Sequence, residues 1–195
     1  MGLTDIKNEL KKLDKNKLID LVAELYKKNK SVKEFFDFYI NPDEKELFNK
    51  YRYKVFEAFY PTRGYKYNLK DGKQAIRNFK KLGPSPIWLA DLMLYYVETG
   101  IKFTNDFGDL DEGFYSSMET TYVAALTLMK KESLLDKFAD RAGKVVSDTS
   151  DIGWGLHYYL GDVFASFYPD NFDDKGEATD QQEIGKVIKL GRKWQ

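Results

Sequence analysis

The chain lacks cysteine entirely and carries a single histidine among its 195 residues. The absence of cysteine excludes disulfides, thiolate nucleophiles and thiolate-bound zinc or iron–sulfur sites. The lone His157 excludes metal sites built from several histidines and leaves one place for a histidine base. Phosphate-binding and nucleophile-elbow motifs are also missing. We therefore expect no cofactor, and the sequence leans against an enzyme.

Long apolar runs are missing as well. The longest, Ile87–Val97, is interrupted by Asp91 and falls short of the roughly 20 residues that span a bilayer. The N-terminus has lysines but no apolar core of a signal peptide. We expect a cytoplasmic protein of bacterial type with no membrane partner.

Net charge is also absent, because 31 basic residues balance 31 acidic ones. Binding to nucleic acid depends on accumulated positive charge, so a nucleic-acid partner is disfavoured. The balance nevertheless hides two adjacent blocks. Residues 61–82 hold seven basic residues and one acidic residue, and residues 83–120 hold seven acidic residues and one basic residue. Such blocks indicate either neighbouring helices that attract each other or a polarised surface that steers a partner.

What the chain has in abundance is aromatic residues and helix signals. Tyr, Phe and Trp make up 16% of the sequence, which suits half-buried surfaces and interfaces. Apolar residues recur at helical spacing, and only 63–69 alternates like a strand. Helix-capping residues precede most of the apolar segments. The expected caps are Thr4, Asp14, Ser31, Asn41, Ser85 and Ser133.

These signals predict an all-α fold of about eight or nine helices. Short connections favour antiparallel helical hairpins, stacked as an irregular α-solenoid or superhelix, with a closed helical bundle as the alternative. We expect one helical domain over 1–169. Residues 170–195 read as a polar linker followed by a C-terminal docking helix. The segment that opens at Pro86 is apolar nearly all round and is expected to be the central helix, with Asp91 and Glu98 on one narrow polar face.

One candidate binding site is the acidic segment after that helix, in which Asn105, Asp106, Asp109 and Asp111 fall within seven residues. Carboxylate and amide oxygens are ligands for Mg²⁺ or Ca²⁺. The calcium-loop pattern is not matched, and Asp111 or its neighbours could instead cap a helix. No metal ligand is therefore assigned.

A second candidate is the segment containing Asp151, Trp154 and His157. Three glycines (153, 155 and 161) in an expected aromatic helix over 153–168 imply close approach by a neighbouring helix or by a ligand. His157 is expected to be a hydrogen-bonded core residue more often than a catalyst, with a contact to Asp151 left open.

The third candidate interleaves basic and aromatic residues in Arg63, Tyr65 and Tyr67. Such residues suit single-stranded nucleic acid, and the alternative is a loop whose rings anchor on the body of the protein.

Three segments carry a family resemblance: DLMLYYVETGIKFTNDFGDLDEGFY, GWGLHYYLGD and KLIDLVAELYKKNKSVKEFF. Together they resemble a family of small bacterial all-helical proteins that bears only a domain-of-unknown-function label, over about residues 5–168. That resemblance implies no activity, cofactor or catalytic residue. Residues 45–129 are also similar to helical-hairpin regions beside SWIM-type zinc fingers, but the zinc-binding Cys and His are missing, so no zinc or DNA role follows.

The sequence as a whole favours a cytoplasmic protein-interaction module with a protein partner. A divalent-metal-binding protein or enzyme built on carboxylates is the alternative, and a nucleic-acid-associated protein is a weaker one. Oligomeric state is not predicted.

Overall fold

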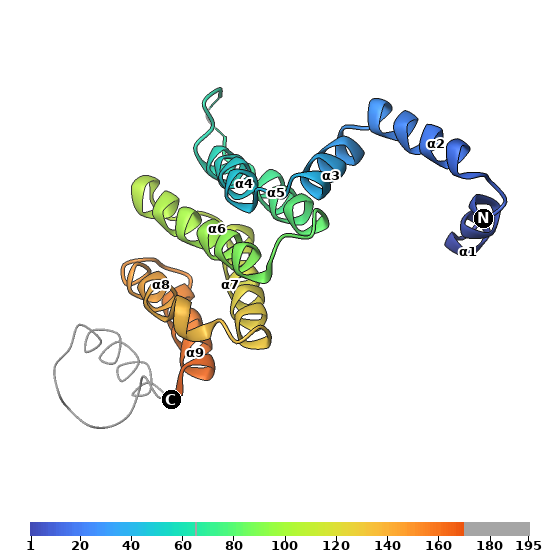
Figure 1. The fold of residues 1–195 in the computed structure, drawn as a ribbon. Coiled ribbons are helices and arrows are strands. Elements are labelled where there is room, and N and C mark those ends of the chain that lie inside the picture. Colours follow the sequence, from blue (N-terminus) through green and yellow to red (C-terminus); the bar gives the residue numbers. More distant parts are fainter. Residues whose placement is uncertain (65, 170–195) are drawn as a thin grey trace. The chain divides into compact units, whose positions relative to one another are not determined.

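The computed structural model describes residues 1–64 and 66–169, and these hold nine α-helices and no strand (Figure 1). The all-α prediction is therefore confirmed. The choice between a superhelical stack and a closed bundle stays a prediction. The chain divides into two compact units, Met1–Asp43 and the residues from Glu44 onward. The predicted linker and docking helix at 170–195 lie outside the described residues.

The N-terminal unit consists of α1 (Leu3–Leu10), α2 (Lys15–Lys28) and α3 (Lys30–Ile40). Asp14 caps α2 as predicted, because its carboxylate accepts the backbone N–H of Lys17 at 2.9 Å. The predicted capping box at Ser31 is wrong. Asn29 caps α3 instead, and its side-chain oxygen accepts the N–H groups of Ser31 and Val32. Asn29 alone separates the two helices, which diverge from this corner (Figure 1).

The second unit places six helices in the described part of the chain. They are α4 (Glu44–Phe59), α5 (Leu69–Lys81), α6 (Pro86–Phe107), α7 (Glu112–Lys131), α8 (Leu135–Ser147) and α9 (Leu156–Phe167). Each of α4–α5, α6–α7 and α8–α9 is a pair of packed neighbours, and α6 also lies against α4, α5 and α8. The predicted central position of α6 is confirmed, since it buries residues along its whole length.

Buried aromatic side chains from all six of these helices fill the core of this unit, and α8 contributes Phe138. The fully buried ones are Tyr51, Phe59, Phe79, Tyr96, Phe114, Tyr122 and Phe164. Tyr96 and Tyr122 keep their hydroxyls paired, with Ser117 Oγ at 2.8 Å and with the carbonyl of Ala142 at 2.9 Å. This pairing is what allows phenols to be buried without loss of hydrogen bonds.

Several predicted boundaries differ from the structure. The described residues of 63–69 form no strand, and Asn68 caps α5. Helix α1 begins at Leu3 with Gly2 as its N-cap, so Thr4, the predicted cap, lies inside the helix. Helix α4 begins at Glu44, past Asn41, and α8 begins at Leu135, past Ser133. Ser85 precedes α6 as predicted, but its hydroxyl donates to the Glu44 carboxylate at 2.9 Å rather than to its own helix.

No helix within 1–64 and 66–169 combines the length and apolar character needed to cross a bilayer.

Helices α5 and α6 approach each other closely at a glycine. A Cβ on Gly72 would lie 2.6 Å from Cε2 of the Tyr96 ring and 3.3 Å from the Cβ of Ala58. Since Tyr96 is fully buried and hydrogen-bonded through its hydroxyl, its ring has no free space to move into. The small residue is therefore required by packing rather than by backbone conformation.

The substitution Gly72→Ala tests this packing. Helix propensity alone would stabilise the protein by about 1 kcal/mol, whereas overpacking against Tyr96 costs about 1–3 kcal/mol. We expect a net fall in the free energy of unfolding, measured by urea denaturation. Lys81→Ala, at the exposed end of the same helix, should change it by less than about 0.5 kcal/mol. A stabilised Gly72→Ala protein would contradict the close approach.

Candidate functional site

The predicted acidic segment is not a single loop. Helix α6 continues through Asn105 and Asp106 to Phe107, so these two residues lie in its last turn. Asp109 lies in the connection to α7. Asp111 caps α7, and its Oδ1 accepts the backbone N–H of Phe114 at 3.0 Å. The capping alternative for Asp111 is thus confirmed.

Each of the three aspartates accepts a hydrogen bond from a different tyrosine. Tyr60 donates to Asp106 Oδ2 at 2.6 Å, and Tyr115 donates to Asp109 Oδ1 at 2.9 Å. Tyr67 donates to Asp111 Oδ2 over a longer 3.5 Å. Lys102, one turn before Asp106, forms an ion pair with the same oxygen at 2.6 Å. The carboxylates are therefore held apart by their own partners.

These contacts shift proton affinities in opposite directions. The hydrogen bond from Lys102, followed by that from Tyr60, lowers the pKa of Asp106. Burial and then Asp106 raise the pKa of Tyr60. Burial and then Asp111 raise the pKa of Tyr67. At neutral pH Tyr60 is accordingly a phenol that donates to the Asp106 carboxylate.

Tyr60 and Tyr67 belong to a group of aromatic side chains where α4, α6 and α7 meet. Neighbouring ring centroids lie between 4.8 and 6.3 Å apart. The group consists of Phe59, Tyr60, Tyr67, Phe103, Phe107 and Phe114. Tyr60 could not be predicted as part of this site, because nothing in the sequence links it to Asp106, which lies 46 positions later.

The structure brings the second candidate segment against the first. Asn105 donates to the backbone carbonyl of Asp148 at 2.8 Å, and the N–H of Gly153 points to Asp109 Oδ1 at 3.4 Å. A Cβ on Gly153 would lie 2.9 Å from the other oxygen of Asp109. Close approach at Gly153 is therefore real, and the approaching group is Asp109.

The expected helix over 153–168 begins later, at Leu156. Gly153 and Gly155 therefore lie in the turn before it, and Gly155 has φ +71°, a conformation that glycine adopts at little cost. Trp154 also has positive φ, 61°, and its side chain is 63% exposed. Its ring centroid lies 6.4 Å from that of Tyr115, so this edge of the unit presents an exposed indole.

His157 is a core residue. It is 8% exposed, and its Nδ1 lies 3.0 Å from both the carbonyl of Val146 and the hydroxyl of Thr149. Burial lowers the pKa of His157. The neutral ring then donates from Nδ1 to Val146, which ties α9 to the end of α8. Its hydrogen-bond partners are therefore Val146 and Thr149, and Asp151 is exposed in the turn.

Among the described residues, no three His, Asp or Glu side chains converge closely enough to hold a metal ion. The chemistry of the donor set agrees with this, since the aspartates at 106, 109 and 111 each accept a tyrosine hydroxyl.

The structure places Arg63 and Tyr67 of the third candidate in different surroundings. Arg63 lies with Glu57, Asp71 and Gln74 around an open polar hollow of about 490 Å³ between α4 and α5. Tyr67 donates to Asp111 on α7. Tyr65 lies outside the described residues.

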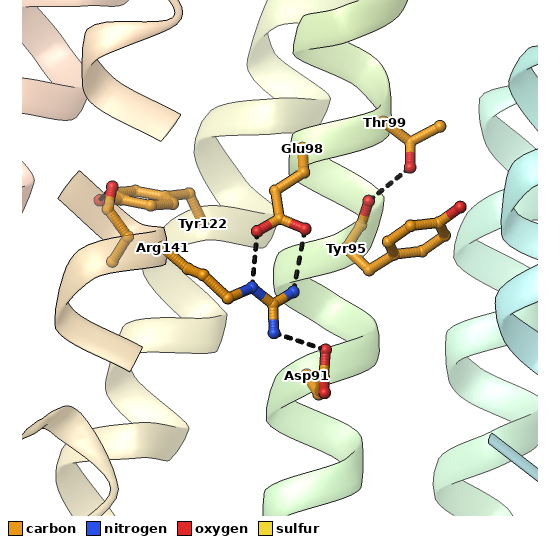
Figure 2. A network of polar contacts seen from close by, with 7 residues as sticks. Asp91, Tyr95, Glu98, Thr99, Tyr122 and Arg141 are labelled. Carbon is orange, nitrogen blue, oxygen red and sulfur yellow. Dashed lines mark hydrogen bonds and ion pairs between the residues drawn. The ribbon is translucent and has the colours of Figure 1, made fainter. Parts of the chain in front are cut away.

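An ion-pair network that the sequence revealed only in part connects α6 to α8 (Figure 2). Asp91 and Glu98 share one face of α6 as predicted, and Arg141 of α8 bridges them. Arg141 Nε and Nη2 donate to the two oxygens of Glu98 at 2.8 and 2.9 Å, and Nη1 donates to Asp91 at 2.8 Å. Burial alone would lower the pKa of Arg141, but hydrogen bonds to Glu98 and then Asp91 raise it.

An aromatic ring borders the arginine of this network, since the Arg141 guanidinium lies 5.6 Å from the ring centroid of Phe138. The ring of Tyr95 points away from Arg141, and the guanidinium of Arg52 from α4 lies 4.4 Å from its centroid (Figure 2). The side chains of Arg141, Asp91 and Glu98 are 38%, 26% and 29% exposed. The paired carboxylates are thus fully occupied by one arginine, and the network acts as a clamp between helices.

Removal of the arginine should leave two half-buried carboxylates facing each other. We expect Arg141→Met to lower the free energy of unfolding by about 2 kcal/mol, between the values of exposed and buried pairs. The measurement is urea denaturation of Arg141→Met, Glu98→Gln and the double variant. Lys144→Met, which breaks an exposed pair on the same helix, is the matched control and should cost less than about 0.5 kcal/mol. If the double variant lost as much unfolding free energy as the two single variants together, the clamp would not couple the helices.

The lone histidine makes a direct titration possible. An NMR titration of the single imidazole should give a midpoint below the ordinary value of about 6.5. The imidazole of the unfolded chain then has the higher pKa and binds a proton more readily than the folded one. The free energy of unfolding therefore keeps its full value above neutral pH and falls as the pH drops through about 6.5. His157→Gln should reduce the difference in unfolding free energy between pH 7.5 and 5.5. An imidazole midpoint at or above 6.5 would contradict the buried, neutral ring.

Comparison with known proteins gives a family but no function. A family of unknown function, DUF6155, matches residues 1–168. No curated protein and no solved structure matches the chain. The similarity to regions beside SWIM-type zinc fingers finds no support in these comparisons. The extent of the family match agrees with the resemblance that the sequence segments carry. The chain therefore belongs to the family of unknown function DUF6155.

Proposed function

We propose that the chain is a protein-interaction module whose N-terminal unit, 1–43, is the element that docks on a partner. One observation carries the proposal. In these 43 residues, all of which the structure describes, no residue is buried. Apolar side chains on all three helices are exposed. They are Leu3, Ile6, Ile19, Leu21, Val22, Leu25, Phe35, Tyr39 and Ile40, and Leu13 between α1 and α2 is exposed as well.

The helices of this unit are more stable when their apolar faces are buried against another surface. Helices of 8, 14 and 11 residues are marginal in water when they stand alone. Their stability in proteins comes from burying an apolar face, at about 25 cal/mol per Å². The second unit has a filled aromatic core, whereas the N-terminal unit gains such stabilisation only when something covers it. Contiguous apolar surface of this kind is typical of an interaction site.

The charges of the second unit support the same proposal. On α5, Arg77 donates to the amide oxygen of Gln74 at 3.2 and 2.8 Å, and Lys73 donates to the hydroxyl of Thr120 at 3.3 Å. These partners are neutral, so they do not offset the positive charges of Lys73 and Arg77. The two blocks of opposite charge then create a field that orients an approaching protein.

We favour this function over a carboxylate metal site because the aspartates of that site are each paired with a tyrosine. We favour it over nucleic-acid association because basic and aromatic residues 63 and 67 face different neighbours. Neither alternative uses the exposed apolar helices.

Site-specific photocross-linking in the cells that make the protein tests the proposal. The photoreactive residue p-benzoylphenylalanine replaces Val22 on the apolar face of α2, or Asp20 on its polar face as the matched control. We expect a covalent protein adduct from position 22 and none from position 20, because only the apolar face is covered. Equal adducts from both positions, or none from either, would contradict the proposed function.

A further inference from the structure

The exposed apolar surface of α2 and α3 is shaped as a groove. The two helices diverge from Asn29, and between them lies an open hollow of about 460 Å³. Its walls are almost wholly apolar. They include Leu18, Ile19, Val22 and Ala23 of α2 with Phe36 and Ile40 of α3.

Polar contacts at the corner fix how the two helices leave it. The hydroxyl of Tyr26 donates to Asp37 at 2.7 Å and accepts from Lys33 at 2.9 Å. Lys33 also lies 4.6 Å from the Tyr26 ring centroid. Asn29 holds the first N–H groups of α3. These contacts pin the first turns of α3 to the end of α2, so the groove beyond them stays open.

Helix α2 is apolar over more than the groove. At 100° per residue, its apolar side chains cover an arc of about 200°, from Leu21 at one edge to Ala23 at the other, wider than the stripe that one neighbouring helix buries. Leu21 and Leu25 lie at one edge of this arc, outside the groove, and are 41% and 48% exposed. Helix α2 therefore provides one wall of a groove and also an apolar helix of the kind that such a groove accepts.

This combination is self-complementary. If the α2 helix of one copy lies antiparallel in the groove of another, a two-fold axis places the groove faces of the two α2 helices together. Leu21 and Leu25 of each copy then reach the wall formed by Phe36 and Ile40 of the other. The result is a four-helix arrangement made of two α2 and two α3 helices, with an apolar centre that a single copy lacks.

Area and charge agree with a second copy as the occupant. The exposed apolar side chains of α2 and α3, 40–75% exposed, present on the order of 700 Å² per copy. This is close to the roughly 800 Å² per partner of a stable interface. Residues 1–43 hold nine lysines and eight acidic residues, so two copies meet with little repulsion. Such a weak charge gives no preference for an anionic membrane or a strongly charged protein.

We propose, building on the function proposed above, that the partner of the N-terminal unit is a second copy of this chain, bound by reciprocal insertion of α2 into the α2–α3 groove.

Sedimentation of the purified full chain between about 1 and 100 µM, the range of a moderate interface, tests the proposal. We expect a concentration-dependent dimer for the wild type. Val22→Lys should be a monomer at every concentration, because it places a charge at the centre of the groove. Asp20→Asn changes the net charge equally but lies on the polar face, and it should dimerise like the wild type. Far-UV circular dichroism and the Tm of the second unit check that each variant is folded.

The absence of native cysteine allows a second measurement. Val22→Cys should be captured as a covalent dimer by a short thiol-reactive cross-linker, and Asp20→Cys should not. A dimer that cross-links only through position 20 would overturn the proposed geometry.

The possible failures are distinguishable. A wild type that remains monomeric at 100 µM, while position 22 still photocross-links to a different protein in cells, overturns the second copy as the occupant and leaves the interaction function standing. A monomer with no adduct in cells overturns both.

Discussion

The burial of α6 is the constraint on which the second unit depends. This helix lies against α4, α5, α7 and α8, so each polar group that it buries needs a hydrogen-bond partner. Arg141 supplies that partner for Asp91 and Glu98, and Ser117 supplies it for Tyr96. At the C-terminal end, Tyr60, which directly follows α4, does the same for Asp106, and Lys102 of α6 itself adds an ion pair. The polar residues of α6 thus specify which helices surround it, while the aromatic side chains fill the space between them.

The two units differ in whether they bury their apolar side chains. The second unit has a core filled by buried aromatic side chains. The aspartates at 106, 109 and 111 and His157, which the sequence singled out, have hydrogen-bond partners within it. The N-terminal unit has well-formed caps at Asp14 and Asn29 but no core. Local signals set where its helices begin, yet they leave the apolar faces uncovered. The proposed interaction function rests on this contrast rather than on any reactive group.

The sequence predicted the features that depend on neighbouring residues. The all-α class, the cap at Asp14, the start of α6 at Pro86 and the shared face of Asp91 and Glu98 all follow from spacing or local hydrogen bonding. Contacts between distant segments were not predictable. Nothing marks Arg141 as the partner of two acids on α6, or Tyr60 as the partner of Asp106. The glycines at 153 and 155 were placed in a helix because the sequence does not reveal that Asp109 approaches the turn before it.

The central claim is that the N-terminal unit becomes a packed structure only when its apolar faces are covered. Amide hydrogen exchange of the full chain, followed by mass spectrometry at about 1 and 100 µM, tests it most directly. We expect the protection of backbone amides in α2 and α3 to rise with protein concentration, while that of α6 stays constant. Equal exchange of α2 and α3 at both concentrations would contradict it.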